Sequence, residues 1–78
     1  MAFSIRVVDS DGQPRKSARV GARSITLLGG AKSEYTDEDG WAKFNWPGLP
    51  ATFIISVNGV DQHGQYALDD GDTESFTV

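Results

Sequence analysis

TDEDGWAKFNWPGLP, residues 36–50, contains a short strand between two turns. The first turn is a run of acidic side chains that ends at Gly40, and the second carries Pro47-Gly48 and Leu49-Pro50. Glycine accepts backbone angles that other residues avoid, and proline fixes φ, so both are typical turn residues. We predict a type II turn with Pro47 and Gly48 at its two central positions.

Between these turns the side chains alternate, which is the period of a β-strand with one buried face. The even-numbered residues are Ala42, Phe44 and Trp46, and the odd-numbered ones include Trp41 and Lys43. Phe44 and Trp46 are the better core residues, so we predict that the even positions face inward. Trp41 then points outward, which is unusual for so large an apolar side chain.

The same alternation predicts strands throughout the rest of the chain, joined by turns rich in Gly, Asp and Pro. Asn58-Gly59 is a strong signal for a two-residue hairpin turn. The residues predicted to face inward are Phe3, Ile5, Val7, Ala18, Val20, Ala22, Phe53, Ile55, Val57, Tyr66, Leu68, Phe76 and Val78.

The segment from residue 22 to residue 35 is harder to interpret. The apolar phase changes after Ser24, because Ile25 and Leu27 are odd-numbered, and a β-bulge near Ala22–Ser24 would reconcile the two phases. Gly29-Gly30 then suits a two-residue hairpin turn, with a flexible loop as the alternative. The hairpin predicts these neighbours: Leu28 with Ala31, Thr26 with Ser33, and Tyr35 with Ser24.

Length predicts a single domain over residues 1–78. The short strands and the regular spacing of the turns predict an all-β antiparallel Greek-key-type sandwich of about seven strands. A chain of this size buries roughly 60–65% of its unfolded surface, so the core is modest. There is no cysteine to form a disulfide or a thiolate metal site. Packing of the aromatic residues must therefore supply most of the stability.

The net charge of −4 is unevenly spread along the chain. Residues 1–33 hold six basic and two acidic side chains, and residues 34–78 hold one basic and nine acidic ones. An acidic surface argues against non-specific nucleic-acid binding, which needs lysine and arginine. No apolar run has the length of a membrane helix or a signal peptide. We expect a cytoplasmic protein if the chain is complete, and an extracellular one if it is cut from a larger secreted protein.

Turn and core residues in order along the chain carry a resemblance to a known family. They are Val8-Asp9, Asp11-Gly12-Gln13-Pro14, Ala18-Arg19-Val20, Thr36–Gly40, Phe44, Gly48-Leu49-Pro50, Phe53, Gly59 and Gly71-Asp72-Thr73. In these the chain is similar to the carboxypeptidase regulatory-like domains, which are transthyretin-like (prealbumin-like) β-sandwiches. The resemblance implies a non-catalytic module that folds beside an enzyme or forms one unit of an adhesive array. It does not extend to the family's catalytic branch, which uses several His and Arg side chains.

We find no constellation of residues typical of catalysis. The single His63 lies in a predicted loop, where a surface histidine is the simpler interpretation. The sequence predicts no cofactor and no metal. Calcium in the acidic turns is a weaker alternative, with Asp9, Asp11, Asp37 and Asp39 as its ligands. Aspartate and glycine are also what tight turns select, and the closing glutamate of an EF-hand loop is missing.

Trp41 is the residue that suggests binding. Tryptophan is enriched at protein interfaces and can stack on sugars. If Trp41, Ile54 and Tyr35 form one exposed patch, an interface is favoured, whereas a Trp41 lying flat over a neighbouring strand needs no function. We predict a non-catalytic structural or protein-interaction module with a protein partner or self-association. The alternative is a carbohydrate-binding module that uses Trp41.

Overall fold

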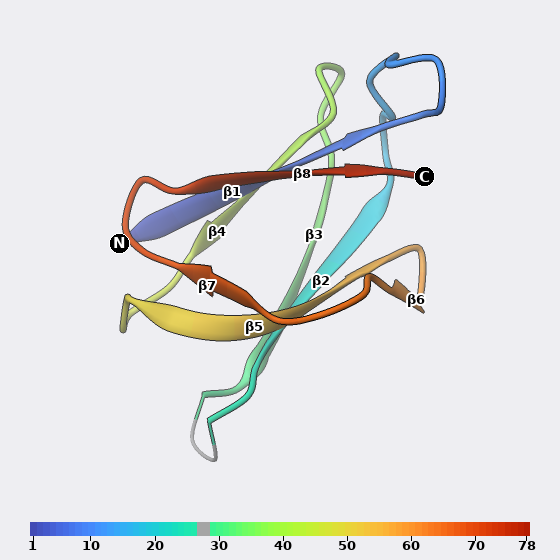
Figure 1. The fold of residues 1–78 in the computed structure, drawn as a ribbon. Coiled ribbons are helices and arrows are strands. Elements are labelled where there is room, and N and C mark those ends of the chain that lie inside the picture. Colours follow the sequence, from blue (N-terminus) through green and yellow to red (C-terminus); the bar gives the residue numbers. More distant parts are fainter. Residues whose placement is uncertain (27–28) are drawn as a thin grey trace.

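The computed structural model describes residues 1–26 and 29–78, and this part of the chain forms eight strands and no helix (Figure 1). The strands are β1 (Ala2–Val8), β2 (Arg19–Ser24), β3 (Ala31–Tyr35), β4 (Trp41–Asn45), β5 (Ala51–Val57), β6 (Val60–Asp61), β7 (Tyr66–Leu68) and β8 (Thr73–Thr77). The all-β class is thus confirmed.

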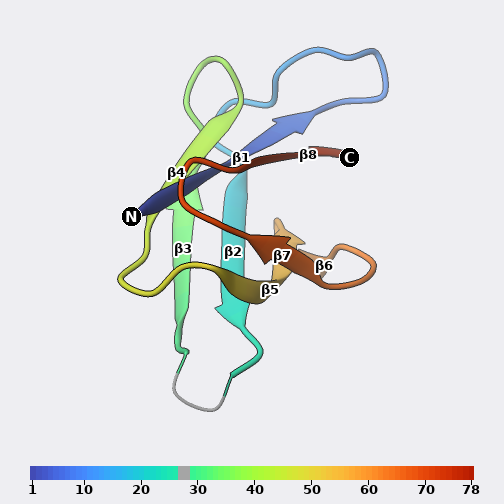
Figure 2. The same cartoon turned by 60° about the vertical axis from the view of Figure 1, so that its left-hand side comes forward.

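The described strands form two sheets that face each other across one core (Figures 1 and 2). The smaller sheet has the order β4-β1-β8, and the larger one has the order β3-β2-β5-β6, with β7 also paired to β5. Strands β6 and β7 both pair with β5. Each of them pairs with a different end of that strand. β8 is an edge strand of the smaller sheet, and a short turn joins it to β7 at the edge of the larger sheet. β6, β7 and β8 therefore lie on the same side of the sandwich (Figure 1).

The core consists of the inward side chains of both sheets, as alternation predicted. Those of β1, β4 and β5 are buried, and so are Val20, Ala22 and Leu68. An aromatic cluster joins the two layers: the Phe53 ring lies 4.8 Å from the Phe3 ring and 4.8 Å from the Trp46 ring, measured between centroids. Val78 differs from its prediction, because it is 42% exposed at the end of the sandwich.

One pair of strands corrects the predicted antiparallel sandwich. β1 and β8 are parallel, with Ser4 beside Thr73 and Val8 beside Thr77. The other described pairs are antiparallel. Parallel strands need a long connection, and here nearly the whole chain lies between the two. Local turn signals therefore cannot reveal this pairing.

The predicted bulge and Gly29-Gly30 hairpin are both wrong. β2 keeps its phase to its last residue, where Ser24 is buried and pairs with Phe53. The β2–β3 register places Tyr35 opposite Arg19, and the connection runs from Ile25 to Gly30. The predicted contact of Leu28 with Ala31 lies outside the described residues. All of β3 is exposed, so no apolar pattern fixed its register in the sequence.

The two remaining turn predictions have opposite outcomes. Asn58 and Gly59 have φ values of 51° and 84° and join β5 to β6 as the predicted two-residue turn. Gly48 does not have the positive φ that a type II turn requires at that position. The chain there turns instead with a cis peptide bond between Leu49 and Pro50.

Candidate functional site

Trp41 lies on the outer face of the smaller sheet, as predicted, and is half-buried. It pairs with Arg6 of β1, whose guanidinium carbon lies 5.7 Å from the centre of the indole ring. The Arg6 side chain also donates a hydrogen bond to the carbonyl oxygen of Asp39. A cation over an aromatic face is an attractive contact, so Arg6 supports Trp41 and covers one side of its ring.

The structure does not bring Trp41 together with Ile54 and Tyr35. These two residues belong to the larger sheet, on strands β5 and β3. Ile54 pairs with Arg23 and Tyr35 lies opposite Arg19, so the two are at different ends of β2. Tyr35 is 67% exposed and Ile54 is half-buried. The three predicted binding residues therefore do not form one continuous patch.

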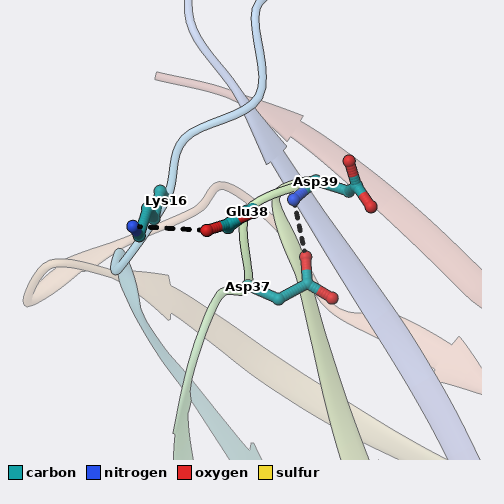
Figure 3. Close-up of polar contacts among 4 residues, drawn as sticks. All are labelled: Lys16, Asp37, Glu38 and Asp39. Carbon is teal, nitrogen blue, oxygen red and sulfur yellow. Dashed lines mark hydrogen bonds and ion pairs between the residues drawn. The ribbon is translucent and has the colours of Figure 1, made fainter.

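The first two acidic turns have the same design. In one, Asp9 accepts hydrogen bonds from the amides of Asp11 and Gln13 through its Oδ1. In the other, Asp37 accepts the equivalent bonds from the amides of Asp39 and Trp41. Each aspartate thus closes its own turn, the role that aspartate commonly has in such loops. Glu38 points the other way, and its carboxylate lies 3.6 Å from the Lys16 ammonium (Figure 3).

The third acidic turn connects β7 to β8 and holds the start of β1. Asp70 accepts a hydrogen bond from the Ala2 amide, and Asp72 accepts one from the Asp69 amide. Across residues 1–26 and 29–78, no group of three or more His, Cys, Asp or Glu side chains is arranged to hold a metal ion. His63 is exposed, and its carbonyl oxygen accepts a hydrogen bond from the Tyr66 hydroxyl.

Trp46 borders a shallow pocket of about 390 Å³ at one end of the smaller sheet. The indole itself is only 5% exposed, because Lys32 of β3 crosses over it. The Lys32 ammonium lies 5.5 Å from the ring centre and donates a hydrogen bond of 2.6 Å to the Asn45 carbonyl oxygen. This lysine closes the sandwich at this point, so the pocket offers little apolar surface to a ligand.

A second pocket, of about 330 Å³, lies at the opposite end, where the core is not covered. We name it the open-end pocket; its lining includes Arg15, Val57, Val60, Gln62, Thr77 and Val78. Val57 is buried at its base, whereas Val60 is 65% exposed and Val78 is 42% exposed. Val60 pairs with Val57 and thus faces the same side of the sheet. The pocket is therefore an uncovered continuation of the core between the two sheets.

The β5–β6 hairpin that forms one wall of this pocket is held firmly by β2. The Asn58 amide donates a hydrogen bond of 2.8 Å to the Arg19 carbonyl oxygen. In return, the Asn58 side-chain oxygen accepts a hydrogen bond of 2.9 Å from the Arg19 amide. Past the hairpin, the Gln62 amide donates to the Ile55 carbonyl oxygen. Val57 and Val60, on the two strands of this hairpin, are therefore placed by the fold before any ligand binds.

The sequence interpretation missed the open-end pocket, although a signal for it was present. A two-residue turn at Asn58-Gly59 pairs the residues on either side of it, which puts Val60 on the same face as the buried Val57. What the sequence did not reveal is that the end of β8 and the loop bearing Arg15 stop short of covering Val60.

Compared with known proteins, the chain matches no family model and no curated protein. Separately, within the described residues no helix is long and apolar enough to cross a membrane.

Proposed function

We propose that this chain is a non-catalytic protein-interaction module that binds its partner at the open-end pocket, alone or within a larger assembly. The observation that carries the proposal is the exposure of Val60 and Val78 next to the buried Val57. Exposed apolar side chains that border a concavity are typical of interaction sites, whereas scattered single ones are not informative. Burial of both valines in a complex would complete the core.

We also propose that the fold is a Greek-key, transthyretin-like sandwich. In support, sheet neighbours such as β1 and β4, or β2 and β5, are distant in the chain, so that the connections cross between the two sheets. An experimental structure compared with known transthyretin-like domains tests this. A different order of strands would refute it.

The proposed function is tested with a phage-displayed library of random dodecapeptides selected on the immobilised chain. Selection is repeated on Val60→Glu, which puts a charge at the pocket, and on Ile25→Glu as the matched control. Ile25 is 47% exposed just past the end of β2 that is remote from Asn58. We expect enriched peptides to bind wild type and Ile25→Glu equally and to lose most of their binding to Val60→Glu.

The selection has two outcomes that count against the proposal. If no peptide is enriched on the wild-type chain, the interaction function fails. If enriched peptides bind Val60→Glu as well as wild type, the module binds peptides elsewhere. Thermal unfolding of both variants, followed by circular dichroism, shows that each is folded under the conditions of selection.

Carbohydrate binding is the second candidate, and Trp41 is the observation that favours it. The indole lies on the outer face of the smaller sheet, with Ser4 and Lys43 nearby on the same face. Arg6 covers part of it, so a sugar would have to displace or share this contact. Titration of soluble oligosaccharides against tryptophan fluorescence tests the idea, with Trp41→Ala to assign the signal because the buried Trp46 remains. No change on titration would eliminate this candidate.

A further inference from the structure

The open-end pocket lies beside the free edge of β8. This strand ends the smaller sheet and pairs with β1 alone among the described strands. The ladder between them includes hydrogen bonds from the Ser4 amide to Asp72 and from the Val78 amide to Val8, of 3.0 and 2.9 Å. Because strand amides alternate in direction, those of Thr73, Ser75 and Thr77 point away from β1.

We propose that the partner is an extended peptide that adds a strand to this edge of β8. One apolar side chain of the peptide fills the open-end pocket, and an acidic side chain pairs with Arg15. This inference rests on the proposed function and specifies the partner of the same site. Strand addition is a common mode of peptide recognition, in which main-chain hydrogen bonds give affinity and pockets for alternate side chains give specificity.

β3 is the edge strand of the larger sheet, and its free edge differs from that of β8 in a way that supports this choice. Lys32 and Glu34 of β3 lie opposite Ala22 and Val20, and so on the inner side of the sheet. Charged side chains that point inward at an edge oppose the addition of another strand. β8 has one such charge, Glu74, at the end remote from the pocket, while Phe76 occupies its inner side nearer the pocket.

Charge and shape together define what the peptide must carry. Arg15 is the only charged side chain that lines the pocket, and among the described residues no carboxylate lies within ion-pair distance of it. Val57, Val60 and Val78 give this pocket of about 330 Å³ an apolar wall that suits an aliphatic side chain. An acidic side chain next to an apolar anchor on the peptide matches both, because guanidinium–carboxylate contacts are strong hydrogen bonds.

The main test uses the strongest peptide from the dodecapeptide selection, made synthetically with both ends capped. Its affinity is measured for wild type, for Ser75→Pro and for Ser33→Pro. Proline removes an edge amide at both positions, and both amides point away from the strand's partner, so neither variant loses a ladder hydrogen bond. We expect Ser75→Pro to weaken binding at least about 10-fold and Ser33→Pro to change it by less than about twofold.

Two further measurements make the test independent of whether Ser75→Pro folds. Two versions of the peptide are made, one methylated on the odd-numbered and one on the even-numbered backbone nitrogens. Only the version whose methyl groups face β8 should lose binding to the wild-type chain. Hydrogen exchange should show protection of the Thr73, Ser75 and Thr77 amides when the peptide is bound. For charge, Arg15→Glu should weaken binding about 10-fold and select peptides without the acidic residue.

The outcomes separate this inference from the proposed function. Suppose that peptides whose binding depends on Val60 bind Ser75→Pro as tightly as wild type, and that their methylated forms bind wild type as tightly as the unmodified peptides do. The pocket then binds peptides, but no strand is added. If the peptides carry no acidic preference, the role of Arg15 is wrong. If the chain itself dimerises and Ser75→Pro makes it monomeric, the occupant is a second copy and the inference is overturned. An empty selection removes the proposed function as well.

Discussion

Gly12 and Gly40 occupy the same position in two turns of the same design, yet their surroundings differ. Their φ values are +82° and +83°, a backbone conformation that other residues adopt only with strain. A Cβ atom at Gly12 would have no neighbour within 4 Å. One at Gly40 would lie 2.6 Å from the carbonyl oxygen of Val7. Gly40 is thus required both by its turn and by the packing of that turn on β1.

This pair gives the first prediction. Gly12→Ala should lower the free energy of unfolding by about 1 kcal/mol, the cost of a left-handed conformation alone. Gly40→Ala should cost about 3 kcal/mol or more, because the turn must also move away from β1. Urea denaturation followed by circular dichroism measures both. Equal losses would show that the Val7 contact is not a constraint in solution.

Thr36 is a buried residue that joins the β3–β4 connection to the β1–β2 connection, and it carries the second prediction. Its hydroxyl accepts a hydrogen bond from the Ala18 amide and donates one to the Arg15 carbonyl oxygen. Thr36→Val keeps the shape but leaves both backbone groups without this partner, so we expect a loss of about 1–3 kcal/mol. Thr36→Ser keeps the hydroxyl and should lose less. Unfolding curves in which Thr36→Ser is less stable than Thr36→Val would refute this role of the hydroxyl.

At the scale of elements, β2 lies between β3 and β5, and Gly21 is its residue without a side chain in the row that the three strands share. This residue pairs with Ser33 on one side and Ser56 on the other. A Cβ atom placed on Gly21 would lie 2.5 Å from the Ser56 hydroxyl oxygen. A side chain at this position would therefore require the Ser56 hydroxyl to move.

A double-mutant cycle tests this contact between β2 and β5. Gly21→Ala alone should destabilise the chain by about 1–2 kcal/mol, because the serine must shift. In a Ser56→Ala background, the same change should cost less than about 0.5 kcal/mol or be neutral, since the oxygen is gone. The coupling energy comes from urea unfolding of the four proteins. If the effects of Gly21→Ala and Ser56→Ala on the free energy of unfolding were strictly additive, the serine side chain would turn away from the new methyl group without cost.

The whole molecule depends on the aromatic cluster that joins its two sheets. Phe3 and Phe44 come from the smaller sheet and Phe53 from the larger one, and all three are almost fully buried. The chain has no cysteine, so no disulfide joins the two sheets and their contact depends on packing. Loss of one ring should therefore affect both sheets together.

The corresponding prediction concerns cooperativity. Phe53→Ala should cost about 3–5 kcal/mol, most of the stability of a domain this small, and leave the chain largely unfolded. Tyr35→Ala, at an exposed position, should change stability by less than about 0.5 kcal/mol. For wild type, the unfolding curves from tryptophan fluorescence and circular dichroism should coincide. Separate midpoints would mean that the sheets unfold independently.

Several features of this molecule were accessible from the sequence because they depend on neighbouring residues. Alternation of apolar and polar side chains identified the inward faces of β1, β4 and β5, since successive side chains on a strand must point to opposite sides. Asn58-Gly59 indicated its hairpin because only a few residue pairs tolerate those φ values. Trp41 was correctly placed on the outside for the same reason of alternation.

Other features depend on contacts between residues that are far apart in the chain, and only the tertiary structure decided them. β3 is exposed on both faces, so its register follows from β2 and not from its own sequence. The parallel pairing of β1 with β8 joins the two ends of the chain, and no local signal specifies it. The separation of Trp41 from Ile54 and Tyr35 follows from the assignment of their strands to different sheets. Likewise, the open-end pocket exists because no other segment of the described residues covers Val60, and periodicity cannot show which core positions are left uncovered.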